Sequence, residues 1–145
     1  MVAVRFGGDS SFATVASPTY LEGRARLQTP ADLAEHVYIH FRLLDGRIYH
    51  WEFVRDGQAL ALDVAGQLTV NDSELLVGAA LDGSGITFMP ERYARHLIAS
   101  EQLVSLLDNW APSFPGMYLY YPSHRHVPPT LRAFIDVLKQ IDAKR

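Results

Sequence analysis

Residues 68–90 read LTVNDSELLVGAALDGSGITFMP and contain the pattern that decides the fold. Residues 68–70 are apolar and partly β-branched, which is typical of a strand. After the polar triplet at 71–73, leucine and alanine recur at helical spacing, and Gly83 can end that helix. Residues 86–89 are again strand-like. A strand, a helix and a second strand in this order indicate an α/β domain.

The rest of the chain alternates between the same two patterns. Asp45-Gly46 lies between two strand-like runs and predicts a β-hairpin, which would supply antiparallel strands to a mixed sheet. Pro128-Pro129 precedes the clearest helix of the chain, whose apolar residues recur on one face. Further strands are predicted at 2–6, 37–42, 48–53, 59–64, 103–107 and 117–121, and further helix starts at Pro18, Thr29-Pro30 and Pro90.

The composition is that of an ordinary globular domain. The 145 residues are 48% hydrophobic and 20% charged, which is enough apolar surface for a core. With a formal charge of −3, the chain itself should not bind DNA or RNA strongly. The absence of cysteine excludes disulfides and Cys-ligated zinc and fits a reducing cytoplasm. We find no secretory signal and no apolar run of membrane-spanning length, so we predict a cytoplasmic protein without a membrane partner.

The turn at 71–73 is the candidate binding site that the residues alone suggest. Asn71, Asp72 and Ser73 join a strand to a helix start, where free backbone N–H groups and the positive end of the helix dipole favour an anion. Ligands of open α/β sheets also bind outside the carboxyl ends of strands. The alternative is that these side chains only cap the helix.

Six histidines invite a metal hypothesis. His36 and His40 are four residues apart, but a strand at this position would hold them about 13 Å apart, too far for one zinc ion. His124 and His126 flank Arg125 in a predicted turn that supplies no third ligand. We therefore predict no metal site.

A hydrolase would need a nucleophile on a tight turn, as in the G-x-S-x-G motif. Residues 83–85 read Gly-Ser-Gly, which lacks that spacing and is better explained as a helix end followed by a turn. Asp72 and Glu74 are explained by capping and by the helix dipole. We predict neither an enzyme nor a cofactor, and a small hydrolase using His50 or Asp72 is the weakest alternative.

An ordered series of motifs resembles the effector-binding domain of LysR-type transcriptional regulators. The series begins at residues 2–7, continues through 17–21 and 29–33, and includes most of the stretch 70–90 quoted above. Toward the carboxyl end it comprises Leu103-Val104, Leu107-Asp108-Asn109-Trp110, Pro115 and residues 118–129 and 131–136. The match covers nearly the whole chain, and the order of the motifs makes it specific.

The resemblance implies a Rossmann-like lobe of a periplasmic-binding-protein-like fold with a mixed sheet. In that family two such lobes enclose a small-molecule effector, and an amino-terminal helix-turn-helix reads the promoter. We therefore expect a remnant strand of the first lobe at 1–14, the second lobe at 15–117, and the crossover strand and last helix of the first lobe at 118–145. The effector contacts that the resemblance implies are Phe6, Gly7 and Gly8, then Asn71, Asp72 and Ser73, then Tyr118 and Tyr120.

The resemblance also implies missing parts and an interface. We expect the chain to lack the helix-turn-helix that would bind DNA, together with most of the first lobe; whether it is a gene fragment or a degenerate paralogue stays open. Leu131, Phe134, Ile135 and Leu138 form an apolar stripe that would pack on that lobe. We predict that this stripe covers another surface, either on this chain or on a second chain in a homo-oligomer.

The resulting prediction is a regulatory domain that senses a small-molecule effector, either an organic acid or an aromatic compound. A stand-alone small-molecule binding protein is the first alternative. The identity of the effector, the target promoter and the sign of regulation lie beyond the sequence. Two structural expectations follow: residues 2–6 should run beside 117–121, and the turn at 71–73 should stay outside the core.

Overall fold

A computed structural model describes residues 1–62, 66–122 and 126–144 of the protein, and the chain divides into two compact units. Unit 1 comprises Met1–Ser10 and Phe114–Arg145, and unit 2 comprises Ser11–Ser113. The assignment of 1–14, 15–117 and 118–145 to two lobes of a larger domain stays a prediction. No helix among the described residues is both long enough and apolar enough to cross a membrane.

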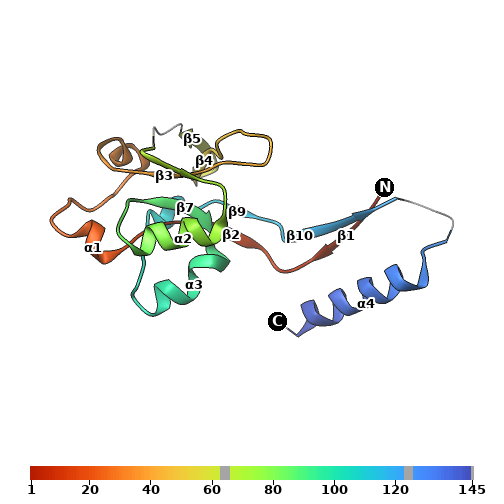
Figure 1. The fold of residues 1–145 in the computed structure, drawn as a ribbon. Coiled ribbons are helices and arrows are strands. Elements are labelled where there is room, and N and C mark those ends of the chain that lie inside the picture. Colours follow the sequence, from red (N-terminus) through yellow and green to blue (C-terminus); the bar gives the residue numbers. More distant parts are fainter. Residues whose placement is uncertain (63–65, 123–125, 145) are drawn as a thin grey trace. The chain divides into compact units, whose positions relative to one another are not determined.

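Unit 1 contains a two-stranded ribbon and a long helix (Figure 1). Strands β1 (Val2–Phe6) and β10 (Met117–Tyr121) pair antiparallel along their whole lengths, with Val2 opposite Tyr121. The expectation that these two segments run side by side is confirmed. Helix α4 (Pro129–Ala143) contacts β1, and its proline at the first position suits a helix start because that residue needs no N–H partner.

The apolar stripe of α4 is only partly covered. Ile135 is 7% exposed, Leu131 and Leu138 are half-buried, and Phe134 is 52% exposed. Since Ile135 is already covered within the chain, an oligomer contact on this helix would have to rest on Phe134 and its exposed neighbours. The role of the stripe in an oligomer stays a prediction.

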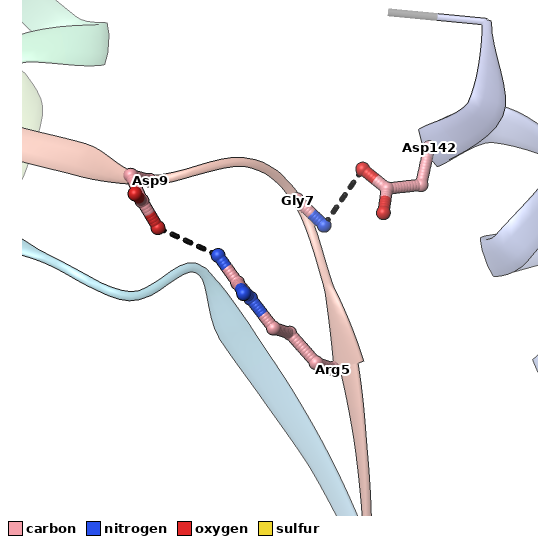
Figure 2. Close-up of polar contacts among 4 residues, drawn as sticks. All are labelled: Arg5, Gly7, Asp9 and Asp142. Atoms are coloured by element: carbon pink, nitrogen blue, oxygen red, sulfur yellow. Dashed lines mark hydrogen bonds and ion pairs between the residues drawn. The ribbon is translucent and has the colours of Figure 1, made fainter.

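The end of β1 is tied to the last turn of α4. Gly7 has a φ of +79°, a conformation that favours glycine, and its N–H donates to the Asp142 carboxylate at 2.9 Å (Figure 2). Arg5 forms an ion pair with Asp9 at 2.6 Å beside the same turn. The dipole of α4 disfavours a negative charge near its carboxyl end, so the hydrogen bond to Gly7 offsets an unfavourable placement of Asp142.

We expect Asp142→Ala to destabilise this turn by about 1 kcal/mol, because the Gly7 N–H loses its acceptor. Removing the unfavourable charge near the helix end offsets part of this loss. Amide hydrogen exchange at Gly7 should become several-fold faster. Asp136→Ala, an exposed carboxylate of the same helix, is the matched control and should leave Gly7 unchanged. Equal exchange at Gly7 in both variants would contradict the prediction.

Unit 2 holds the remaining elements. Pairing and burial group them around one sheet, with short helices at the ends of its strands. In chain order the elements are β2 (Ser10–Ala16), α1 (Pro18–Leu21), the 3₁₀ helix η1 (Pro30–Glu35), β3 (Ile39–Phe41), β4 (Trp51–Arg55), β5 (Gln58–Leu62), β6 (Leu68–Val70), α2 (Ser73–Leu81), β7 (Thr87–Pro90), α3 (Glu91–Ala99), β8 (Val104–Leu106), the 3₁₀ helix η2 (Asp108–Trp110) and β9 (Ser113–Phe114).

The sheet of unit 2 is mixed, as predicted. Strand β2 lies between β7 and β8 and pairs antiparallel with both, and β9 also pairs with β2. Strand β3 pairs parallel with β6, and a parallel bridge between Tyr38 and Ile86 joins β3 to the start of β7. The strand order is therefore β6-β3-β7-β2-β8; its parallel part comprises β6, β3 and β7, and α2 connects β6 to β7.

The two faces of this sheet carry different cores. Successive residues of a strand point to opposite faces. On β7, Phe88 therefore joins a cluster with Trp51 and Phe53, whereas Met89 joins a cluster with Leu76 of α2. Helices α2 and α3 contribute to the second cluster and the β4–β5 hairpin to the first.

The hairpin predicted at Asp45-Gly46 is wrong in its extent. Among the described residues, the pairing across that turn is short: one antiparallel bridge between Arg42 and Ile48, with backbone bonds from Leu43 to Arg47 and from Tyr49 to Phe41. The reason is that Ile39 is fully buried in the middle of the sheet, where β3 pairs with β6 on one side and the Ile39 N–H donates to Ile86 on the other. Only at the end of β3 does the Phe41 carbonyl accept a backbone bond across the turn, from the Tyr49 N–H. The extended hairpin forms instead at Asp56-Gly57, where β4 and β5 pair over their full lengths.

The predicted helix starts at Pro18 and Thr29-Pro30 are confirmed by their hydrogen bonds, α3 begins directly after Pro90, and the one change is the type of helix at Pro30. The Ser17 hydroxyl accepts the Tyr20 N–H at the start of α1. The helix predicted at Pro30 is the short 3₁₀ helix η1. At its start the Asp32 carboxylate accepts the N–H groups of Thr29 and Gln28, and these bonds lower the pKa of Asp32.

Candidate functional site

The carboxyl ends of the parallel strands meet at one edge of the sheet in unit 2. Phe41 ends β3, Val70 ends β6 and Pro90 ends β7, and the start of α2 at Ser73 follows directly after β6. Ligands of open α/β sheets bind outside such strand ends, because loops and helix starts converge there without filling the space.

A cavity of about 220 Å³ lies at this edge. Its apolar lining comes from Phe12, Phe41, Leu43, Leu76, Phe88 and Pro90. Three hydroxyl-bearing residues complete the lining: Tyr49, Ser73 and Tyr93. None of these nine residues is charged. An apolar hollow with a few hydroxyl groups is the usual character of a small-molecule site.

Three aromatic rings form one wall of the cavity. Phe12 stacks on Phe88 with ring centroids 4.7 Å apart, and on Tyr49 with centroids 5.5 Å apart. Tyr49 and Phe88 also stack, at 6.3 Å. Phe88 is held from behind by the core around Trp51 and Phe53, so the wall is fixed by packing. We call Phe12, Tyr49 and Phe88 the aromatic wall.

In contrast to the packed aromatic wall, Tyr93 in the first turn of α3 is partly exposed and makes a polar contact. Tyr93 is 41% exposed, and its hydroxyl accepts a hydrogen bond from the Arg92 guanidinium at 3.3 Å. The same guanidinium lies 4.8 Å from the centre of the Tyr93 ring. The hydrogen bond and the charge of Arg92 lower the pKa of Tyr93. By contrast, burial and the Glu52 carboxylate raise the pKa of Tyr49.

The predicted site at 71–73 lies outside the core, as expected, with Asn71 and Asp72 exposed and Ser73 half-buried, but its three residues have different roles. The Asp72 carboxylate caps α2 by accepting the N–H groups of Glu74 and Leu75 at 2.9 and 3.1 Å. Those N–H groups are therefore already hydrogen-bonded and not free for an anion, so Asp72 has the capping role that was the alternative to ligand binding. Asn71 is exposed and does not line the cavity, whereas Ser73 does.

The other predicted effector contacts belong to unit 1. Phe6 ends β1 and is half-buried, Gly7 donates to Asp142, and Gly8 follows in the turn. Tyr118 and Tyr120 are exposed on β10, and their ring centroids are 6.2 Å apart. A role for these residues in effector binding stays a prediction.

The aromatic residues of the cavity were missed by the sequence reasoning. Phe12, Tyr49 and Phe88 are apolar residues of strand-like runs, which the patterns assign to the core. One available indication was the rule that ligands bind at the carboxyl ends of strands, which selects Phe41 and Pro90 as well as the turn at 71–73.

Of the residues considered for metal and hydrolase chemistry, Asp72 caps α2, His36 packs against Tyr20, and His50 is exposed. The His36 ring hydrogen-bonds the Tyr20 hydroxyl at 2.9 Å, and burial together with the Arg24 charge lowers the pKa of His36. In the part of the chain that the structure describes, no three His, Asp or Glu side chains gather as metal ligands. His124 and Arg125 lie outside the described residues. Gly83, at a φ of +81°, ends α2 as predicted.

An α/β unit with an apolar cavity at its strand ends defines a small-molecule binding domain. The chain belongs to the LysR substrate binding domain family, whose model matches residues 1–142. The expected fold and class, an effector-binding regulatory domain of LysR-type transcriptional regulators, are thereby confirmed. The family is made up of transcriptional regulators and not of enzymes.

Individual relatives agree with this assignment. A putative transcriptional regulator of Pseudomonas aeruginosa is 38% identical over 140 residues, which are 96% of this chain and 46% of the relative. The HTH-type transcriptional regulator PgrR of Escherichia coli is 34% identical over 140 residues, 96% of this chain and 47% of PgrR. The regulatory domain of CrgA, a LysR-type regulator from Neisseria meningitidis, superposes with a TM-score of 0.78 at 27% identity, covering 97% of this chain and 68% of that one. The chain thus spans about half the length of the curated relatives that it matches.

Proposed function

We propose that this chain is the sensing domain of a bacterial transcriptional regulator and that the cavity of unit 2 binds its small-molecule effector. The observation that carries the proposal is the cavity of about 220 Å³, which is lined only by uncharged residues and lies where the parallel strands end. Protein interiors are packed with few voids, so an aromatic hollow at this place favours a ligand site.

The other parts of the proposal follow from charge and from the relatives. A formal charge of −3 gives the chain no field that would attract DNA. DNA binding would therefore come from a helix-turn-helix of the kind that the name of PgrR states for that relative. The chain itself would have no enzymatic activity, since Asp72, the carboxylate weighed for a hydrolase, caps α2.

We expect Ser73→Leu to weaken effector binding at least tenfold, because the larger side chain would fill part of the cavity from the start of α2. Ligands are first found by a thermal-shift screen of small organic acids and aromatic compounds on the unaltered chain. Their dissociation constants are then measured by calorimetry for the chain and for the variant.

Glu74→Leu is the matched control. Glu74 is the next residue of the same helix turn, is exposed and does not line the cavity, so this variant should bind like the parent. Circular dichroism checks that both variants are folded. Ligands that bind equally well to Ser73→Leu and to the parent would refute the assignment of the cavity.

A further inference from the structure

We infer that strand β10 is a contact surface for a second copy of this chain, and that the two β10 strands pair antiparallel across a twofold axis at Leu119. The ribbon of unit 1 would then become a four-stranded sheet in the order β1-β10-β10-β1. The contact lies in unit 1 alone and is independent of the cavity of unit 2. Three features carry it: the open edge of β10, the absence of charge on this strand, and its palindromic residue pattern.

The edge of β10 that faces away from β1 is open. Within residues 1–62, 66–122 and 126–144, β10 pairs with β1 and with no other strand (Figure 1). In an antiparallel strand, alternate N–H and C=O groups point to the second edge and are free to bind another strand there. A two-stranded ribbon by itself is marginally stable in water, whereas further strands add stability.

Strand β10 has none of the sequence features that normally prevent pairing at an edge. Natural edge strands carry charged residues, especially lysine, or proline. Residues 117–121 read Met-Tyr-Leu-Tyr-Tyr and contain neither a charge nor a proline. The other strand of the ribbon, β1, contains Arg5 and is contacted by α4. The freer edge of the ribbon is therefore that of β10.

The residue pattern of β10 is self-complementary. With a twofold axis at Leu119, Tyr118 of each copy lies opposite Tyr120 of the other copy. Tyr118 is 42% exposed and Tyr120 is 63% exposed, and their ring centroids are 6.2 Å apart within one strand. The pairing would thus gather four tyrosine rings on one face of the sheet. Aromatic side chains directly opposite each other stabilise a strand pair, and a twofold contact uses the same residues on both copies.

Helix α4 leaves room for this pairing. The residues of β1 alternate between half-buried and exposed, and Arg5 is on the exposed face. Tyr118 is the cross-strand partner of Arg5, so Tyr118 and Tyr120 share the face that α4 leaves open. The two β1 strands would be about 14 Å apart, at ~4.8 Å for each strand spacing. That separation exceeds the roughly 8–10 Å between packed helices, so the two α4 helices need not overlap.

The area of the contact predicts a weak dimer. The exposed parts of Tyr118 and Tyr120 together amount to about one tyrosine side chain, or roughly 200 Å² for each copy. A stable complex buries about 800 Å² for each partner. We therefore expect a dissociation constant on the order of 100 μM, so that the dimer forms only at high protein concentration.

A single introduced cysteine can report this contact, because the chain contains no cysteine of its own. Facing residues of an antiparallel pair have Cα atoms about 4.5–5.5 Å apart, which is within the range of a disulfide. Under mild oxidation, Leu119→Cys should form a disulfide-linked dimer at least tenfold faster than Tyr120→Cys. Tyr120→Cys is the matched control, because its two copies would lie diagonally, about 7–8 Å apart. Position 120 is also the more exposed of the two, so equal or faster linkage there would overturn the inference.

Two double variants test the antiparallel register. Tyr118→Lys with Tyr120→Lys places like charges opposite each other on the two copies, whereas Tyr118→Lys with Tyr120→Glu places opposite charges there. Both variants lose the same two rings, and hydrogen exchange of β1 checks that the ribbon of each is intact. In sedimentation equilibrium at up to about 1 mM, the parent should form dimers, and the first double variant should associate at least threefold more weakly than the second. Equal association of the two variants would overturn the inference, as would a parent that stays monomeric or grows beyond dimers.

Discussion

Phe88→Ala is expected to destabilise unit 2 by about 3–5 kcal/mol, the usual loss when a large aromatic side chain is removed from a core. Phe88 is only 4% exposed. Its ring stacks on Phe12 and Trp51 and meets Phe53 at a centroid distance of 5.8 Å. The truncation would leave a hole that these neighbours cannot easily fill, because they are held on two different strands, β2 and β4. Urea unfolding followed by tryptophan fluorescence measures the loss.

Two variants make this prediction specific. Phe88→Leu keeps most of the volume and should cost markedly less than Phe88→Ala. Phe134→Ala removes the same side chain from the half-exposed face of α4 and should cost about 1 kcal/mol or less. Loss of similar size in Phe88→Ala and Phe134→Ala would mean that the aromatic wall is not part of a packed core.

Gly116→Ala is the second substitution with a large expected effect, this time in unit 1. A Cβ atom at Gly116 would overlap the carbonyl oxygen of Gly7 and lie 2.8 Å from that of Phe6. Both atoms belong to the backbone and cannot swing aside, so β1 and β10 would have to separate at this end. We expect a cost of about 2–3 kcal/mol, as for other overpacked positions.

Hydrogen exchange measured by mass spectrometry tests the expectation for Gly116. Peptides that cover β1 and β10 should lose protection in Gly116→Ala. Gly8→Ala is the matched control because a Cβ at Gly8 meets nothing within 4 Å and the backbone there needs no positive φ. Protection of the ribbon that is equal in the two variants would show that the close approach at Gly116 is not required.

The elements that local chemistry specifies were predicted well. Alternation of residue types predicted strands β1 and β10, and proline at a helix start predicted the beginning of α4. The structure has all three where expected. The hairpin at Asp45-Gly46 was overestimated because a turn motif acts locally, whereas the pairing of Ile39 is decided by strands distant in the sequence. Of the residues that line the cavity, the sequence predicted only Ser73 as part of a binding site, because a polar residue between a strand and a helix start can be recognised from the local pattern.

The sequence by itself determined the class of fold and the family, because periodicity, helix caps and the order of motifs are carried by residues close together along the chain. Only the tertiary structure decided that Phe12, Tyr49 and Phe88 form one wall and that Ser73 and Tyr93 line the same cavity. The physical reason is that apolar burial has no preferred direction or partner. Which aromatic residues meet is therefore fixed by the long-range pairing of strands and not by any local pattern.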